Sequence, residues 1–214
     1  RYPMSLEARS LTFRYPRRGK KPVLEHVNLT LEPGERIGLT APSGRGKTTL
    51  CKLLAGYERP TAGEILLDGR PLSHYRGACP VQMIWQHPET VLDPLLPLEV
   101  SLKEAGPVEE RLLEELHIQP QWLRRYPQEL SGGELQRFCI ARALGRATRY
   151  LLCDEITAML DPITQAQIWG FLLREAERRN LGLLIVSHSA PLLERVCTRV
   201  EVLSSPPEKT TPLS

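Results

Sequence analysis

The chain has 214 residues, of which 41% are hydrophobic and 25% charged, and this composition is typical of a globular protein and excludes extensive disorder. The length fits one domain, or one domain with an inserted subdomain. The formal net charge of +3 is too small for a dedicated nucleic-acid-binding protein, so we expect no nucleic-acid partner. No apolar run reaches the roughly 20 residues of a membrane helix. The five cysteines are scattered and match no disulfide framework or zinc site.

The first third of the chain predicts short strands that lead through a glycine-rich loop into a helix. Apolar and polar residues alternate in runs separated by turn signals, which predicts strands over Leu6–Arg9, Leu11–Tyr15, Val27–Leu31 and Arg36–Leu39. After the loop at 41–46, leucines at helical spacing predict a helix over Lys47–Gly56. A further strand is expected over Glu64–Leu67.

The middle of the chain changes character, and the last third returns to alternation. Val81–Trp85 is expected to form a strand, Glu89–Leu98 is rich in proline and irregular, and helices are expected over Val108–Leu116 and Ser131–Leu144. Strands and helices then follow in turn, over Tyr150–Cys153, Ile163–Arg178, Leu183–Val186, Pro191–Cys197 and Arg199–Leu203. Strands that alternate with helices predict right-handed crossovers and a parallel sheet, and therefore an α/β fold.

The loop between the fourth strand and the first helix matches a phosphate-binding pattern. Residues 41–48, APSGRGKT, fit G-x-x-x-x-G-K-S/T except that Ala41 replaces the first glycine. The two remaining glycines let successive N–H groups face a polyphosphate. Lys47 is expected to reach the β- and γ-phosphates, and the Thr48 hydroxyl to bind Mg²⁺. A Cβ at positive φ would cost roughly 1–2 kcal/mol, so we expect a negative φ at Ala41.

Two further motifs carry chemistry. The apolar strand at 150–155, YLLCDE, ends in two carboxylates, of which Asp154 is placed to hold Mg²⁺ through a water and Glu155 to polarise the attacking water. In LSGGELQR at 130–137, Ser131 and Glu134 have the spacing of a capping box and mark a helix start. Capping does not explain the two glycines between them, which weaken a helix but let bare N–H groups approach an anion.

Together these residues resemble the nucleotide-binding subunit of ABC transporters over nearly the whole chain. APSGRGKT resembles the Walker A motif, YLLCDE the Walker B motif and LSGGELQR the family signature. By the same resemblance Tyr15 stacks on adenine, Gln86 is the Q-loop glutamine near Mg²⁺ and the transmembrane partner, and Asp161 belongs to the D-loop. His188 matches the switch histidine that contacts the γ-phosphate. Asp161 before Pro162 also fits an N-cap with proline at the first helical position.

The resemblance implies a P-loop NTPase of the ABC type, with an antiparallel β subdomain and an inserted α-helical subdomain. The implied division is an ATP-binding core at 1–86 and 138–203, an insertion at 87–137 and a flexible tail at 204–214. ATP and Mg²⁺ are the implied cofactors, with Thr48, Gln86 and Asp154 toward the metal and Glu155, His188, Lys47 and Gln86 in catalysis. The implied nucleotide-binding residues are Tyr15, Ser43, Gly44, Arg45, Gly46, Lys47, Thr48, Thr49, Ser131, Gly132, Gly133, Glu134 and Asp161.

The resemblance further implies an importer ATPase on the cytoplasmic face of the membrane, with transmembrane permease subunits as partners. It would pair with a second ABC ATPase subunit, as a homodimer or a heterodimer, and serve a solute-binding protein indirectly. RYPQEL at 125–130 and LLERVC at 192–197 resemble the peptide and nickel importer branch. Members of that branch often carry a C-terminal extension, and no such regulatory domain is expected here. Ile156 and Glu134 depart from the proline and glutamine usual in the family.

Two alternatives stay open. One is a soluble ABC ATPase without a transport role, of the phosphonate-metabolism type; the coiled-coil insertions of DNA-repair members and the tandem domains of translation members are absent from this sequence. The other is a nucleotide-binding regulatory subunit without turnover, against which the retention of Lys47, Asp154, Glu155 and His188 argues. The solute itself contacts the binding protein and the permease, so no residue of this chain is expected to encode it.

Overall fold

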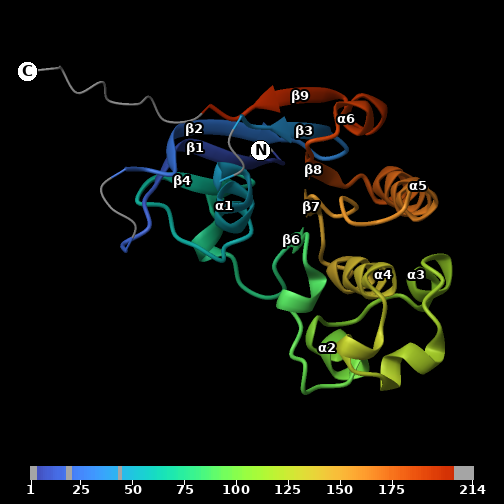
Figure 1. The fold of residues 1–214 in the computed structure, drawn as a ribbon. Helices are drawn as coiled ribbons and strands as arrows, with labels where there is room; N and C mark the ends of the chain where they lie inside the picture. Colours follow the sequence, from blue (N-terminus) through green and yellow to red (C-terminus); the bar gives the residue numbers. More distant parts are fainter. Residues whose placement is uncertain (1–3, 18–20, 43–44, 205–214) are drawn as a thin grey trace, which may run out of the picture.

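The computed structural model describes residues 4–17, 21–42 and 45–204, with only the backbone described for Arg45. Two sheets form its framework (Figure 1). The antiparallel sheet has the order β2-β1-β4-β5, with β1 at Leu6–Phe13, β2 at Leu24–Leu31, β4 at Ala62–Leu67 and β5 at Arg70–Pro71. The parallel sheet has the order β6-β7-β8-β3-β9, with bounds of Val81–Ile84, Tyr150–Asp154, Gly182–Val186, Arg36–Thr40 and Arg199–Val202. The predicted α/β fold is confirmed.

The prediction of two N-terminal strands is wrong, because they form the single strand β1. Its pairing with β2 shifts register between Ala8 and Leu11, and Ser10 between them has φ +46. A β-bulge of this kind adds a residue to one strand and locally breaks the alternation of faces. The polar pair Arg9–Ser10 therefore looks like a turn in the sequence although the strand continues to Phe13.

The inner strands β3, β7 and β8 of the parallel sheet are buried, and the side chains of β7 and β8 alternate between two apolar clusters. Tyr150 and Leu152 of β7 face the cluster shared with the antiparallel sheet, whereas Leu151 and Cys153 face the opposite cluster. This alternation follows from the period of two in a β-strand. Because both faces are covered, the strand is apolar at almost every position, as is usual for parallel sheets.

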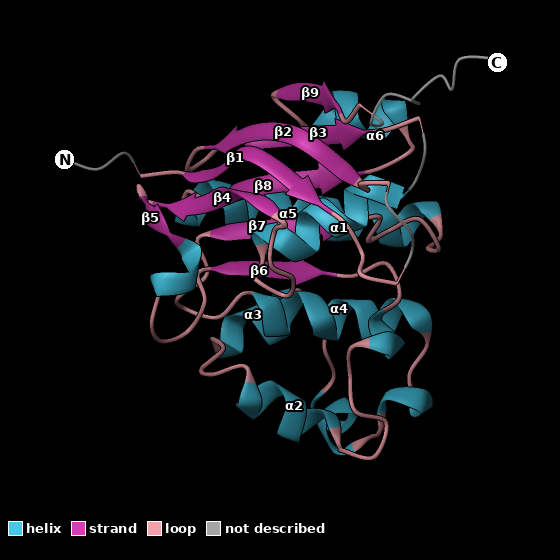
Figure 2. Ribbon diagram, turned by 90° about the vertical axis from the view of Figure 1, so that its left-hand side faces the viewer, coloured by secondary structure: helices cyan, strands magenta, loops and turns pink. Residues whose placement is uncertain are grey.

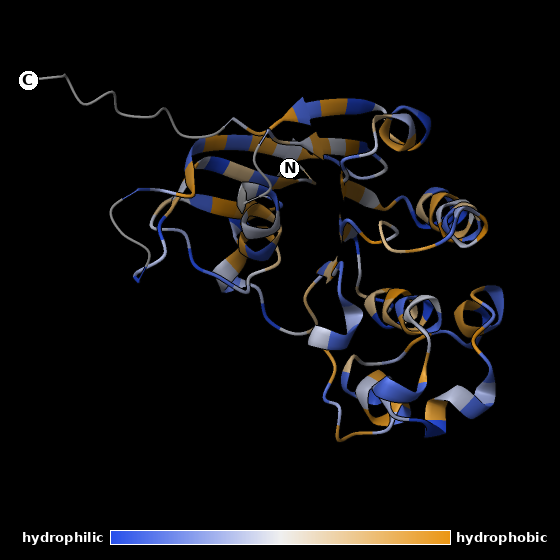
Figure 3. Cartoon of the chain, in the orientation of Figure 1, coloured by the Kyte–Doolittle hydropathy of each residue, from blue (hydrophilic) through white to orange (hydrophobic). Residues whose placement is uncertain are grey.

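Helices cover the two faces of the parallel sheet. Helix α1 at Arg45–Leu54 places Leu50 and Leu53 in the cluster between the two sheets. Helices α5 at Pro162–Arg179 and α6 at Ala190–Val196 pack on the other face (Figure 1). In Figure 3, α5 shows apolar and polar residues side by side, as expected for a helix with one face on a core and the other in solvent.

Three helices lie beyond β6, at the end of the parallel sheet, in both ribbon views (Figures 1 and 2). They are α2 at Leu98–Glu104, α3 at Glu110–Glu115 and α4 at Gly132–Ala143. Helix α4 places Phe138 in a small cluster with the residues around α2, and Ile140 in the cluster under α5. It thus runs across the boundary at 137/138 of the division proposed above. That division remains a proposal.

Helix α2 has no counterpart in the sequence prediction. Its apolar residues Leu98, Val100 and Leu102 recur every second position, which is the period of a strand. Pro97 is the N-cap residue of α2. The segment before it contains only a short 3₁₀ turn at Pro88–Thr90, in keeping with the irregular segment predicted there. Within the described ranges, no helix combines the length and the apolarity that crossing a membrane requires.

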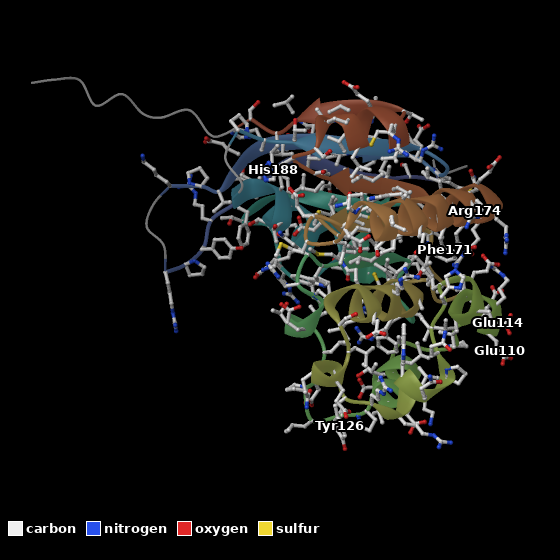
Figure 4. The ribbon with its side chains drawn as sticks, turned by 45° about the vertical axis from the view of Figure 1, so that its right-hand side comes forward. Glu110, Glu114, Tyr126, Phe171, Arg174 and His188 are labelled. Carbon is white, nitrogen blue, oxygen red and sulfur yellow. The ribbon has the colours of Figure 1, made fainter. Side chains whose placement is uncertain are left out.

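A bidentate ion pair fastens α3 to the helix layer of the sheet. Arg111 donates to both carboxylate oxygens of Glu175 on α5, at 2.8 and 2.9 Å. The Glu175 side chain is only 1% exposed, and the arginine contacts hold the pKa of its carboxyl below the usual value although burial opposes this. Figure 4 shows Glu110 and Glu114 at the outer surface of α3.

Candidate functional site

The loops that follow four parallel strands leave from one edge of the sheet. The carboxyl ends of parallel strands point the same way, so residues that follow different strands meet there. Leu39, Asp154 and Val186 lie in one row across β3, β7 and β8. A cavity of about 480 Å³ opens at this edge, and its lining includes six predicted residues, Lys47, Thr48, Gln86, Asp154, Glu155 and His188. We call it the P-loop cavity.

An oxygen pair suited to a hard cation lies in the P-loop cavity. The Thr48 hydroxyl donates to Oδ2 of Asp154 at 2.7 Å, and Asp154 is 5% exposed. Burial raises the pKa of the Asp154 carboxyl, while Thr48 and Lys47 oppose that shift. Among the described residues no three His, Cys, Asp or Glu side chains form a metal cluster. Mg²⁺ does not need one, because it usually binds one or two carboxylates together with substrate phosphates.

Glu155 and His188 face each other across the P-loop cavity. His188 Nε2 lies 3.2 Å from Oε1 of Glu155 and 3.4 Å from Nζ of Lys47. One ring nitrogen cannot donate to the carboxylate and accept from the ammonium at the same time. Over the described part of the chain, Oε1 of Glu155 has no partner at hydrogen-bonding geometry, although it is buried. This oxygen is therefore available to accept a proton or a hydrogen bond from a molecule that enters the cavity.

The backbone at Glu155 is strained. Its φ of +51 is in the left-handed region, where a side chain other than glycine costs about 1–3 kcal/mol. The N–H of Glu155 donates to the carbonyl of Val186 at 3.0 Å, and its own carbonyl accepts from Ala158 at 3.2 Å. These bonds on both sides hold the residue in its unusual conformation. Strain that the surroundings enforce in this way is common at active sites.

The backbone around His188 is held by two serines. The hydroxyl of Ser187 accepts from the N–H of Ser189, and the hydroxyl of Ser189 caps α6 by accepting from Leu192. The imidazole itself is 69% exposed. Figure 4 shows His188 beside the sheet edge rather than near α2 and α3. The ring is thus free to turn while its attachment to the fold is fixed.

The predicted signature residues line a second cavity, of about 640 Å³, which we call the signature cavity. Ser131 caps α4, and both bonds of the capping box with Glu134 are present, at 2.9 and 3.2 Å. A Cβ at Gly132 would meet nothing within 4 Å, and one at Gly133 would make only ordinary contacts beyond 3.6 Å. Nothing in the described part of the chain therefore requires glycine at these two positions. Any requirement for glycine at these positions has to come from a ligand or partner molecule that approaches the start of α4.

Asp161 lines the signature cavity and also caps α5. Its Oδ1 accepts from the N–H groups of Ile163 and Thr164, and the Thr164 hydroxyl donates to Oδ2 at 2.6 Å. The expected N-cap followed by Pro162 is confirmed. Gln86 is the one predicted residue that lines both cavities within the described ranges.

The remaining predicted residues lie around the P-loop. The Tyr15 hydroxyl is 3.2 Å from that of Thr49 on α1, and neither residue lines the two cavities. Gly46 is tightly enclosed, since a Cβ there would come within 3.1 Å of Leu24 and Leu203. Ala41 is not among the described residues with positive φ, as predicted. Ser43, Gly44 and the side chain of Arg45 lie outside the described part of the chain.

Three residues that the sequence analysis did not single out for the site hold the loop after Glu155. Gln136 donates to the carbonyl of Ile156, Gln165 to those of Thr157 and Leu160, and the Trp169 indole to the Thr157 hydroxyl. Trp169 is also a packing residue of the cluster under α5. One sequence signal for Gln136 existed, because it begins an otherwise apolar stripe with Cys139, Ile140 and Ala143.

Comparison with known proteins agrees with this geometry. The model of a family described as ABC transporter matches residues 24–158, more than half of the chain. The chain belongs to the ABC transporter family. Its fold is similar to the solved ATP-binding subunit of an ABC transporter, with a TM-score of 0.79 and 25% identity over 94% of this chain and 87% of that one. A bacterial ABC transporter cassette solved as a dimer gives 0.78 and 24%, covering 93% and 94%.

Curated relatives of this ABC chain are importer subunits by name. The methionine import ATP-binding protein MetN of Staphylococcus saprophyticus is 36% identical over 196 residues, which cover 85% of this chain and 58% of that protein. The nickel import system ATP-binding protein NikE of Staphylococcus aureus is 35% identical over 211 residues, covering 92% and 86%. The chain thus spans little more than half the length of MetN. A nickel importer subunit is among the relatives, as the branch resemblance predicts.

Replacing Gly132 by alanine tests what the signature glycines are for. Because a Cβ has open space there, Gly132→Ala should change the free energy of unfolding by no more than about 1 kcal/mol, in the stabilising direction. ATP hydrolysis should nevertheless fall at least about tenfold, because the methyl group blocks close approach of an anion to the helix start. Thermal unfolding and phosphate release measure the two effects. Unchanged hydrolysis would show that the glycines serve no ligand.

Replacing Asp154 by asparagine should stabilise the nucleotide-free chain. Because burial raises the pKa of this carboxyl, the folded chain binds the proton more tightly than the unfolded one, and stability falls as pH rises between the two pKa values. Asparagine avoids that loss and keeps an acceptor for Thr48. Asp154→Asn should therefore melt above the wild type near neutral pH, and the difference should shrink toward acid pH. A variant that melts below the wild type at neutral pH would contradict this.

Proposed function

We propose that this chain is the ATP-hydrolysing subunit of an ABC importer. The observation that carries the proposal is the arrangement of the two cavities, which meet at Gln86. The P-loop cavity gathers the phosphate-binding Lys47 with Asp154, Glu155 and His188, whereas the signature residues of the same chain line the other cavity. Relatives named as import ATP-binding proteins support the direction of transport.

In this proposal the P-loop cavity binds ATP with Mg²⁺. Thr48 and Asp154, with Gln86 nearby, would hold the cation, which supplies charge neutralisation at the phosphates. Lys47 would bind the β- and γ-phosphates. Tyr15 would stack on adenine, with its orientation set by the Thr49 hydroxyl.

Glu155 acts as the general base in this proposal. Its Oε1 lies 3.2 Å from His188 Nε2 but accepts no hydrogen bond within the described residues, and it takes a proton from the attacking water. The oxygen is already buried, where electrostatic interactions are strong. His188 leaves Glu155 and turns toward the γ-phosphate, which its 69% exposure allows. Lys47 and His188 then stabilise the charge on the transferring phosphoryl group.

The signature cavity would hold the nucleotide of a second subunit. Ser131, Gly132 and Gly133 offer the start of a twelve-residue helix, where backbone N–H groups favour an anion. Open space at both glycines leaves room for a phosphate to reach the main chain. Two subunits would therefore complete two sites, either as a homodimer or as a heterodimer with another ABC ATPase.

A groove next to Gln86 is the proposed docking place for a permease. It encloses about 470 Å³ and is lined by Tyr57, Trp85, Val91 and residues of α4. The rings of Tyr57 and Trp85 meet edge-on with centroids 5.4 Å apart, and Tyr57 is 59% exposed. Because Trp85 directly precedes Gln86, a segment bound here would adjoin the P-loop cavity. The proposed location is accordingly the cytoplasmic face of the membrane, with a solute-binding protein as an indirect partner.

The proposed solute is a peptide, nickel or a metal chelate. NikE at 35% identity over 92% of the chain supports nickel, and RYPQEL and LLERVC support the same branch. The following experiments also test two alternative functions. One is a soluble ABC ATPase without a permease, and the other is a subunit that binds ATP without turnover.

Replacing Glu155 by glutamine tests the role of the base. Glutamine keeps the size of the side chain but accepts no proton, so turnover should fall by about 10²–10⁴-fold while ATP affinity stays within about twofold. Phosphate release and nucleotide binding measure the two quantities. Substantial residual hydrolysis would remove Glu155 from this role. Wild-type chain that binds ATP but releases no phosphate, alone or with its partners, would establish the regulatory subunit.

Affinity capture from detergent-solubilised membranes tests the partners. The tagged wild type should recover polytopic permeases, with or without a second ATPase, in the mass spectrum. Tyr57→Asp should reduce that recovery at least about tenfold without changing ATP binding, because it puts a charge into an aromatic docking groove. Tyr75→Asp is the matched control, since Tyr75 is 45% exposed and does not line the groove. Recovery of soluble proteins only would favour the non-transport alternative.

A further inference from the structure

The buried side chain of Gln136 joins two loops that are far apart in the sequence. Gln136 lies on α4 and is 1% exposed. Its Nε2 donates to the carbonyl of Trp85 at 2.9 Å and to that of Ile156 at 2.8 Å. These partners are 51 and 20 positions away, at the ends of β6 and β7. One amide group thus fastens two loops to one helix.

Each of the two carbonyls adjoins a residue of the P-loop cavity. Trp85 precedes Gln86, and Ile156 follows Glu155. A peptide unit is planar, so a bond to the Trp85 carbonyl also fixes the direction of the Gln86 N–H. The bond to the Ile156 carbonyl fixes the Ile156–Thr157 peptide unit, one residue beyond Glu155 with its φ of +51. Gln136 itself lines the signature cavity and not the P-loop cavity.

Packing alone does not account for a glutamine at this position. Over the described residues, Oε1 of Gln136 has no hydrogen-bond partner although it is buried. The orientation of the amide follows from its partners, because a reversed amide would set Oε1 against two carbonyl oxygens. A buried amide satisfied on one side only is a poorer contribution to stability than an apolar side chain of the same length. What glutamine adds is the pair of donated bonds.

We propose that Gln136 is a positioning residue that couples the signature helix to both Gln86 and Glu155. The proposal rests on the function proposed above, in which the start of α4 contacts the nucleotide of a second subunit. Ser131 caps that start, and Gln136 follows within the second turn of the same helix. A displacement of α4 by the partner's nucleotide would therefore move the two carbonyls, and with them the two loops of this chain's own site.

Gln165 on α5 provides a matched comparison. Its Nε2 also donates twice, to the carbonyls of Thr157 at 2.7 Å and Leu160 at 3.0 Å. Both partners belong to the loop after Glu155, and neither adjoins Gln86. The two glutamines therefore make the same kind of contact to that loop, but only Gln136 also reaches the loop of Gln86.

The test is a pair of double-mutant cycles on the full chain with the partner subunits that copurify with it. Gln136→Met and Gln165→Met remove the donated bonds at nearly constant volume, and each is combined with Gln86→Ala. Gln136→Met should lower kcat at least about tenfold while ATP affinity stays within about twofold. Gln86→Ala should add little in that background, because the Gln86 side chain is already out of position once the Trp85 carbonyl is released. In the Gln165→Met background, Gln86→Ala should lower kcat by the same factor as it does in the wild type.

Several results would overturn the coupling role. A wild-type kcat for Gln136→Met would do so. A double variant whose loss of kcat equals the product of the two single losses would do so as well. A merely structural role would lower the melting temperature and kcat of both methionine variants alike, without the selective coupling to Gln86. Where Gln136→Met does not fold, Gln136→Asn is tested in its place, because its side chain is one methylene shorter and holds the amide away from both carbonyls. Glu155→Gln run in parallel separates the failures, since an inactive Glu155→Gln leaves the proposed function standing.

Discussion

The parallel register of β3, β7 and β8 is the constraint on which the site depends. Because Leu39, Asp154 and Val186 share one row, the chain leaves all three strands at the same level of the sheet. A slip of one residue would turn Asp154 to the opposite face of the sheet and separate it from Thr48. Both faces of these strands are buried, so the apolar clusters on each side fix the register strongly. The core of the protein thus positions its polar edge.

Contiguous motifs made much of this predictable from the sequence. The phosphate-binding loop and the carboxylates after a buried strand are each predicted by a short contiguous motif. The alternation of strands and helices predicts that they meet at one edge of the sheet. Three features were not predictable in this way. The bulge at Ser10 breaks the pattern of a continuous strand, α2 has the period of a strand, and the contacts of Gln136 join segments that only the folded chain brings together. Local patterns carry no information about such contacts.

The two cavities also explain why one chain makes only half of each proposed site. The capping box accounts for Ser131 and Glu134 within the chain, but the open space at Gly132 leaves its small size without an internal reason. The P-loop cavity has the complementary property, since its acidic and basic groups face one another without any signature residue. In the proposed function, the start of α4 and the P-loop cavity are the two halves of one nucleotide site. Two copies, or two related chains, would satisfy both.

Several unfavourable features of the chain lie around these cavities. Within the described residues, Glu155 has a strained backbone and a buried oxygen that accepts no hydrogen bond, and Gln136 leaves one amide oxygen unsatisfied. Asp154 is a buried carboxyl with a raised pKa. Each costs stability, whereas most of the other buried side chains are apolar. Natural proteins break the rules of stable folding chiefly where function requires it. In the proposed function a cation neutralises the charge of Asp154 and a water donates a hydrogen bond to Glu155, so the ligands supply the interactions that the nucleotide-free fold lacks.

Gln136 differs from these two residues. Its amide oxygen is unsatisfied because the amide nitrogen is directed at the carbonyls of both loops. Gln136 thus lines the signature cavity while its donated bonds fix the loops of the P-loop cavity.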